Sequence, residues 1–296
     1  MHAKLMAGAV LLTMSSLLQP ASAAPDWQMV AKAFGKSGTE TPDGVYRVGL
    51  PRTDLKVSLD GVVLKPGFAL GGWVAFEPMG NQAMVMGDIV LTQDEVNPVM
   101  KELEESGIEI TALHNHLLRG EPMTLYMHVF GQGDPVTLAT ALHAGLALSK
   151  TPMENAAQPQ ASAQQIELDT AAVDQAIGRK GKANGSVYQF SIPRAEKITD
   201  GGMAVPASMG SAIAINFQPT GAGKAAITGD FVLIASEVNP VLRALRENGI
   251  EVTALHSHML EEQPRLFFMH FWANDDAAKL ARGLKAALDK MNLSNS

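Results

Sequence analysis

The sequence predicts an α+β protein made of two tandem copies of one unit, each a mainly antiparallel sheet with helices packed on one side. Residues 87–128 align without gaps on residues 229–270, with 23 identities in 42 positions. A repeat of this length indicates a duplicated domain rather than a solenoid. Within each copy, short β-rich runs bounded by turn residues alternate with helical stretches. We expect the two copies to be related by a pseudo-twofold axis.

The first 25 residues have the pattern of a secretory signal peptide. Lys4 precedes an apolar run over residues 6–18, and Ala21-Ser22-Ala23 supplies the small residues of a cleavage site. This run is short for a bilayer span, and no later stretch reaches about 18 consecutive apolar residues. We therefore expect a protein that does not span the membrane and that is periplasmic or secreted.

The boundaries follow from composition. The first repeat domain is predicted over residues 26–150, an Ala-, Gln- and Pro-rich linker over 151–165, and the second repeat domain over 166–292. The first copy should open with a helix over 27–34 that stops at Gly35. Turn residues then bound a series of expected strands: 45–50, 57–64, 72–76 and 83–91.

The second half of each copy carries the most similar residues. A helix is expected over 97–105, with Asn97 as N-cap, Pro98 as its first residue and Gly107 as its stop. A strand over 109–118, a turn over 119–122 and a strand over 123–130 should form a hairpin. An amphipathic helix over 135–149 closes the unit.

Charge and composition exclude several classes of function. The net charge is −7 and no Lys/Arg cluster is present, so nucleic acid is not an expected partner. Cysteine is absent, which excludes disulfides, thiolate metal sites and a cysteine nucleophile. No GxSxG, HExxH, P-loop or GxGxxG motif occurs, so no nucleotide cofactor is expected.

Six of the eight histidines form two matching sets. The candidate metal ligands are His114, His116 and His128 in the first copy and His256, His258 and His270 in the second. Spacing i, i+2 on a strand puts two side chains on one face, and the hairpin brings in the third. Three imidazoles can hold a zinc ion with a fourth position open, and imidazole also suits copper. The alternative is a structural cluster of hydrogen-bonded histidines.

The register of the hairpin rests on the position of its turn. A turn centred on Glu121 pairs His114 with His128 and His116 with Tyr126. The equivalent turn in the second copy pairs His256 with His270 and His258 with Phe268. Opposed Cβ atoms lie about 4.5–5.5 Å apart, close enough for the imidazoles to share one ion. A slip by one residue would move His128 to the other face.

Three kinds of carboxylate near the histidines have two interpretations each. Glu95 is a candidate general base or acceptor for a histidine, or part of the helix start that the string Glu-Val-Asn-Pro forms in both copies. Glu121 is a candidate acid/base at the hairpin tip, or a solvated turn residue; the second copy has Gln263 there. Asp88 and Asp230, in the Gly-Asp pairs of the two copies, are further candidates near the histidines or, in the interpretation we favour, turn residues at strand ends.

The strings LHNH and LHSH, with the later MH and the shared EVNP, resemble the LppY/LpqO family of exported bacterial proteins. The resemblance covers nearly the whole mature chain, because members of that family carry the same duplicated unit. It implies the repeat organisation and no particular chemistry. Family members that are lipoproteins have an anchoring cysteine, which this chain lacks.

The leading hypothesis is an exported protein with a three-histidine zinc or copper site in each repeat. The alternatives are a metal-assisted hydrolase of a cell-envelope substrate and a module that binds a small envelope ligand without metal. The catalytic residues are unknown, with Glu121 and Glu95 as candidates. Helices can cover only one face of each sheet, so we expect the other faces to pair within one chain, giving a monomer.

Overall fold

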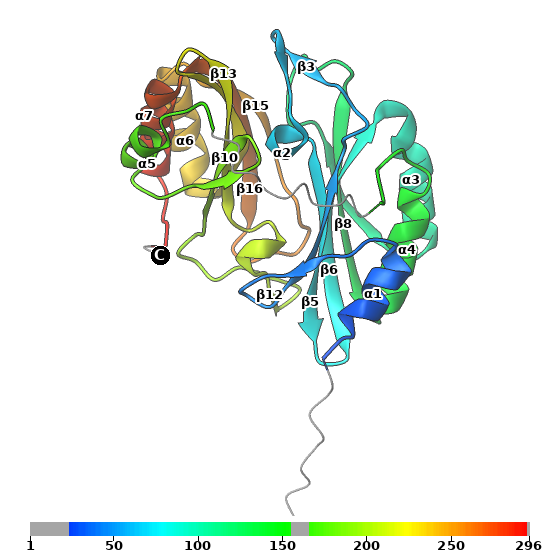
Figure 1. Cartoon of the computed structure of the whole chain (residues 1–296). Coiled ribbons are helices and arrows are strands. Elements are labelled where there is room, and N and C mark those ends of the chain that lie inside the picture. Colours follow the sequence, from blue (N-terminus) through cyan, green and yellow to red (C-terminus); the bar gives the residue numbers. More distant parts are fainter. Residues whose placement is uncertain (1–23, 155–165, 295–296) are drawn as a thin grey trace, which may run out of the picture.

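The computed structural model describes residues 24–154 and 166–294 (Figure 1). The predicted signal peptide lies almost wholly outside these residues, as does most of the predicted linker. Each repeat contains a six-stranded antiparallel sheet. The strand orders are β1-β2-β5-β6-β8-β7 and β9-β10-β13-β14-β16-β15. The sheets are therefore equivalent strand by strand, and the predicted fold class is confirmed.

In the first repeat the helices are α1 (Trp27–Phe34), α2 (Pro66–Ala69), α3 (Gln93–Glu105) and α4 (Pro135–Leu146). The six strands of its sheet are β1 (Thr39–Glu40), β2 (Tyr46–Pro51), β5 (Gly71–Met79), β6 (Gln82–Thr92), β7 (Glu109–His114) and β8 (Thr124–Gly133). Two short strands, β3 (Ser58–Leu59) and β4 (Val62–Val63), form a separate ribbon.

In the second repeat the helices are α5 (Thr170–Ile177), the 3-10 helix η1 (Ala207–Met209), α6 (Ala235–Glu247) and α7 (Ala277–Leu288). Its sheet is made of β9 (Lys182–Asn184), β10 (Val187–Ile192), β13 (Ile213–Gly221), β14 (Lys224–Ile234), β15 (Glu251–His256) and β16 (Leu266–Asp276). The strands β11 (Thr199–Asp200) and β12 (Met203–Ala204) correspond to the ribbon of the first repeat.

Helix α3 begins four residues before its predicted start. Thr92, not Asn97, is the N-cap, and Pro98 lies inside the helix. The sequence Thr-x-x-Glu is a capping box, in which the Glu95 carboxylate accepts the Thr92 backbone N–H at 2.9 Å. The Asn-Pro pair is thus a poorer start signal here than the capping box that precedes it. The predicted strand over 57–64 is also wrong, because β3, β4 and the turn between them replace it.

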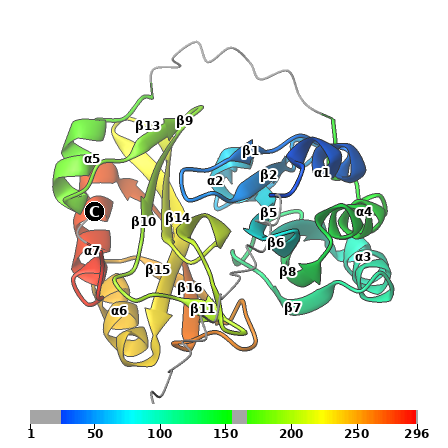
Figure 2. The same cartoon turned by 90° about the horizontal axis from the view of Figure 1, so that it is seen from below.

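Helices α1, α3 and α4 and their counterparts α5, α6 and α7 cover the outer faces of the two sheets, and the inner faces lie toward each other (Figures 1 and 2). The side chains of strand β6 illustrate this arrangement. Val85 and Ile89 pack with the helices of their own repeat, whereas Met84 and Met86 belong to a core shared with the second repeat. Every second side chain of β6 therefore faces the sister repeat.

Polar contacts also join the inner faces. Gln218 accepts the backbone N–H of Lys65 at 2.9 Å and donates to the carbonyl of Val63 at 2.8 Å. The Trp272 ring N–H donates to Asp60 at 3.0 Å. The two repeats therefore share one composite interface. None of the described helices has the length and apolar character needed to span a membrane.

Candidate metal centre between the two repeats

The six predicted histidines all lie on the inner faces of the sheets. His114 is the last residue of β7, His116 lies in the loop that follows, and His128 lies in β8. The second repeat repeats this placement, with His256 at the end of β15, His258 in the loop and His270 in β16. The strand predicted over 109–118 therefore ends four residues early.

The hairpin register differs from the prediction by two residues. Ala112, not His114, pairs with His128, and His114 pairs with Tyr126. A β-bulge between Ile110 and Ala112 accompanies this shift. The second repeat has the same register, with Ala254 opposite His270 and His256 opposite Phe268. A shift of two residues keeps side chains on the same face, so the predicted convergence survives the error.

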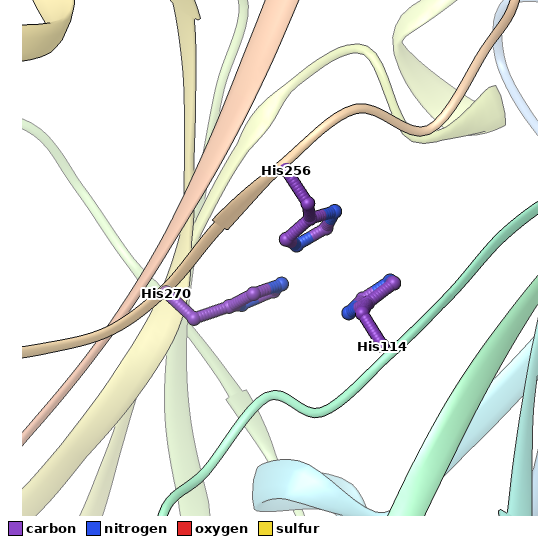
Figure 3. A group of neighbouring side chains, drawn as sticks. All are labelled: His114, His256 and His270. Carbon is purple, nitrogen blue, oxygen red and sulfur yellow. The ribbon is translucent and has the colours of Figure 1, made fainter.

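The two sets of three histidines lie next to each other across the interface between the repeats. The rings stack across the interface, with centroid distances of 3.6 Å for His114–His256, 3.8 Å for His116–His270 and 3.6 Å for His128–His258. Figure 3 shows His114 of the first repeat pointing toward His256 and His270 of the second. We call these six residues the histidine cluster. It lies between the two repeats and belongs to both.

Asp88 and Asp230 complete the cluster, and their interpretation as turn residues is wrong. Each lies within a long strand and pairs with a cluster histidine, Asp88 with His128 and Asp230 with His270. The carboxylate–Nε2 distances are 3.7 Å for Asp88–His128 and 3.6 Å for Asp230–His258. These are too long for hydrogen bonds but within the ~4 Å that can separate two ligands of one ion.

Among the described residues, nearly all the buried side-chain nitrogen and oxygen atoms without a hydrogen-bond partner lie in this cluster. The Nε2 atoms of all six histidines and one carboxylate oxygen each of Asp88 and Asp230 are buried without a hydrogen-bond partner. Three groups of these residues have ligand atoms close enough to hold a metal: His114/His116/His128, His114/His256/His270 and Asp230/His258/His270. Leaving a buried polar atom unpaired costs about 1–3 kcal/mol, so eight together indicate an absent partner.

The other ring nitrogen of three histidines already faces a backbone oxygen. Nδ1 lies 2.8 Å from the Gly229 carbonyl in His270, and 3.3 Å from the carbonyls of Asn115 and Ser257 in His114 and His256. In a neutral imidazole an Nδ1–H that donates to a carbonyl leaves Nε2 as the lone-pair atom. The backbone thus orients the ring as in many metal sites, with Nε2 toward the centre of the cluster.

Burial controls the protonation of the cluster. It lowers the pKa of His114 to about 3 and that of His256 to about 4, and it lowers the pKa of the other four histidines well below the ordinary value. Burial also raises the pKa of Asp88 to about 7, against the charge of Arg47, and raises the pKa of Asp230. The histidines are therefore neutral at neutral pH and available as ligands.

The two candidate acid/base residues lie elsewhere. Glu95 is buried against the guanidinium of Arg52, with contacts of 2.7 and 3.2 Å, and also accepts the backbone N–H of Lys150. All the hydrogen bonds found for Glu95 thus go to Arg52 or to backbone. Glu121 is exposed, and its backbone pairs with Ser58. Neither glutamate is among the described residues that line the cavity beside the cluster.

That cavity has a volume of about 410 Å³ and lies between the repeats. Four cluster histidines and both aspartates form part of its wall. Arg47, Trp73 and Tyr126 line it from the first repeat. Nothing in the sequence pointed to Arg47 or Trp73, because neither is repeated in the second copy. The identical Gly-Asp pairs of the two copies were the available signal for the aspartates.

Comparison with known proteins places the chain in a family. Residues 28–148 and 171–290 each match the family described as Domain of Unknown Function (DUF1259). The chain belongs to this family. The two matches agree with the duplicated unit that the sequence predicts. The name LppY/LpqO stays a resemblance.

The comparison with curated proteins found no match. Among solved structures, a trimeric bacterial microcompartment shell protein, PduB, is similar at 11% identity and a TM-score of 0.22, over 88% of this chain and 96% of that one. EtuB from Clostridium kluyveri is similar at 10% identity and a TM-score of 0.19, over 85% and 90% of the two chains. At TM-scores this low, neither similarity bears on the function of this chain.

Proposed function

We propose that this is an exported metal-binding protein whose histidine cluster, with Asp88 and Asp230, holds zinc or copper between the two repeats. The observation that carries the proposal is the set of eight buried ligand atoms without partners. The predicted signal peptide supports the export part, and amino-terminal sequencing of the mature protein tests it. A chain that keeps residues 1–23 in its native host would contradict export.

The donor set fits these metals. Six imidazole nitrogens and two carboxylate oxygens suit zinc or copper better than the hard cations calcium and magnesium, which prefer oxygen alone. Zinc usually takes about four ligands, so eight donors suffice for two ions. Each repeat supplies one candidate group by itself, and the third group, His114/His256/His270, joins the two repeats. We therefore propose a shared centre in place of one separate site in each repeat.

The test is the metal content of untagged protein after loading with zinc or copper and removal of the excess. We expect at least one equivalent in the wild-type protein and a marked loss in the double variant His114→Ala, His256→Ala. The matched control is His143→Lys, because His143 lies outside the cluster and the second repeat has Lys285 at its position. Wild-type content far below one equivalent, or unchanged content in the double variant, would overturn the proposal.

A metal-assisted hydrolase is the second candidate, and the cavity that reaches the cluster favours it. A substrate bound there would lie beside the metal ligands. Hydrolysis would require the metal to activate a water molecule, since the two candidate glutamates do not line the cavity. Hydrolytic activity that persists after chelation, with the metal content shown to be zero, would exclude this mechanism.

A further inference from the structure

Equivalent positions of the two repeats hold the same residues in the histidine cluster but different residues in the walls of the cavity. Arg47 in β2 corresponds to Gln189 in β10, and both line the cavity. Trp73, opposite Asp88 in the first sheet, corresponds to Ala214, opposite Asp230 in the second. A cluster that bound metal alone would have no need of this difference. The difference points to a second ligand with two unlike ends.

The guanidinium of Arg47 is held in place at this cavity. Its carbon lies 4.0 Å from the centre of the Trp73 ring, in a cation–π contact. One nitrogen, Nη1, donates to the carbonyl of Ser208 in the second repeat. Among the described residues, no carboxylate lies within ion-pair distance of Arg47. No hydrogen bond joins the remaining guanidinium N–H groups to another described residue, and Arg47 lines the cavity, so these groups are available to a ligand there.

The charges around the cavity favour an anion. A metal ion bound by the cluster would add positive charge beside Asp88 and Asp230, and these aspartates line the same cavity as Arg47. Burial desolvates the Arg47 guanidinium and lowers its pKa to about 10, although the charges of Asp88 and Asp43 oppose this shift. Arg47 is therefore still protonated at neutral pH. A planar guanidinium binds carboxylate or phosphate through two parallel hydrogen bonds. The Trp73 ring beside it adds an apolar surface.

We propose that the cavity binds a small organic oxyanion, whose carboxylate or phosphate group is held by Arg47 beside the metal centre. The inference rests on the proposed metal-binding function and names the class of ligand that the same site takes. Gln189, across the cavity, cannot take the place of Arg47, because its amide nitrogen already donates to Asn216 and to the Gly67 carbonyl. A carboxylate and a phosphate share this chemistry, so the test compares the two.

The test is calorimetric titration of the zinc-loaded protein with benzoate, acetate and inorganic phosphate, repeated on protein stripped with a chelator. We expect saturable binding of at least one probe to the loaded protein. Arg47→Gln, which installs the residue of the second repeat, should weaken that binding roughly 10- to 100-fold, as expected for a lost hydrogen bond to a charged group. Benzoate stronger than phosphate identifies a carboxylate ligand, and the reverse order a phosphate ligand.

The controls separate this proposal from a structural role of Arg47. Arg243→Gln removes an exposed positive charge from α6 and should leave binding unchanged. Ala214→Trp leaves Arg47 intact but fills the cavity from the second repeat, and it should also abolish binding. Zinc content and thermal unfolding are measured for every variant, because Arg47 also bonds to Ser208.

The outcomes distinguish the two proposals. If the wild-type protein holds zinc and none of the probes binds at millimolar concentration, the oxyanion site is overturned and the metal centre stands. If the stripped protein binds a probe in an Arg47-dependent way but takes up no metal, the metal centre is overturned and the oxyanion site stands. Binding that Arg47→Gln and Ala214→Trp leave unchanged overturns the proposed place of the site.

Discussion

The two repeats agree in their buried polar groups and differ in the walls of the cavity between them. Arg52 pairs with Glu95 in the first repeat as Arg194 pairs with Glu237 in the second, at 2.7 Å in both. The residues of the histidine cluster and the two aspartates are likewise the same in both repeats. Arg47, Trp73 and Tyr126, which line the cavity, are by contrast replaced by Gln189, Ala214 and Phe268. The shared groups form the fold and the proposed metal centre, and the differences bear on what the cavity accepts.

The largest expected effect is a loss of stability of the metal-free protein at mildly acidic pH, to which both repeats contribute. The folded pKa of each cluster histidine is lowered, to about 3 for His114 and about 4 for His256, whereas an unfolded histidine has a pKa of about 6.5. Below that pH the unfolded chain takes up protons that the folded chain does not. The free energy of unfolding therefore falls as the pH falls toward 4.

Asp88 and Asp230 act in the opposite direction. Their folded pKa values are raised, so the stability they contribute is present below the unfolded carboxyl pKa and is lost as the pH rises toward 7. Six histidines outweigh two aspartates, with a slope of up to about 1.4 kcal/mol per pH unit for each net proton. Denaturant unfolding of chelator-treated protein between pH 4 and pH 7 measures how the free energy of unfolding depends on pH. Stability that is flat or rises on acidification would contradict the expected burial of neutral histidines.

A second prediction tests whether the repeats are equally dependent on their buried ion pairs. Arg52→Ala leaves the Glu95 carboxylate buried without its cation and should lower the free energy of unfolding by about 3–5 kcal/mol. Arg194→Ala should cost a similar amount, because Glu237 is in the same position. Denaturant unfolding at neutral pH measures both, with exposed Arg243→Ala as the control. A large effect in only one repeat would contradict the equivalence of the two ion pairs, and two separate transitions would show that the halves do not unfold together.

A third prediction concerns unequal roles within the symmetric cluster. His114 belongs to two of the three candidate metal groups, whereas its counterpart His256 belongs to one. His114→Ala should therefore reduce zinc content or affinity more than His256→Ala. Zinc titration against a competing chelator measures the two affinities. Equal losses would indicate a centre as symmetric as the fold, and a larger loss in His256→Ala would contradict the grouping.

The fold was largely predictable because its signals are local or repeated. The helix over Trp27–Phe34 has Asp26 as its cap and Gly35 as its stop, and it has the predicted bounds. The start of α3 was missed because two start signals lie five residues apart, and the sequence does not rank the capping box of Thr92 and Glu95 above Asn97-Pro98. The hairpin register was missed because β7 ends at His114 and β8 begins at Thr124, so a long loop replaces the tight turn expected around Glu121.

The candidate site was predictable in its residues but not in its assembly. The i, i+2 spacing of the histidines places them on one face, and a register error of two residues does not change that face. The two sets meet across the interface because the helices leave the histidine face of each sheet uncovered. Both faces of β6 and β8 are apolar enough to be buried, so the sequence does not show which face that is. Arg47 was missed because it is a single charged residue in a short strand, and only the cavity shows its surroundings.

A smaller effect is expected at the aromatic residues that stack on the cluster. Tyr126 lies on His116 at a centroid distance of 3.3 Å, and Phe268 lies on His258 at 3.4 Å. Only the tyrosine donates a hydrogen bond, to the Ala69 carbonyl at 2.5 Å. Tyr126→Phe makes the first repeat like the second and should cost about 0.5–1.5 kcal/mol of stability with zinc content unchanged. A fall in zinc content would show that the hydroxyl is needed by the metal centre.

The smallest effect is expected at the hairpin tips, where the repeats differ by Glu121 and Gln263. The Glu121 side chain is exposed, and its backbone exchanges hydrogen bonds of 2.8 and 2.9 Å with Ser58. Gln263 makes the equivalent backbone pair with Thr199, so an amide is compatible with this turn. Glu121→Gln should change the free energy of unfolding by less than about 0.5 kcal/mol, as surface substitutions usually do.

Zinc content and probe binding of Glu121→Gln should equal those of the wild-type protein, because the side chain does not line the cavity. The reciprocal variant Gln263→Glu should be equally silent. If a hydrolytic activity is found, its rate in Glu121→Gln decides the role that the sequence suggested for this residue. An unchanged rate shows that the tip differs between the repeats without consequence for the site. A rate lowered by 100-fold or more, the usual cost of losing a general base, would mean that the hairpin tip moves to the cavity during the reaction.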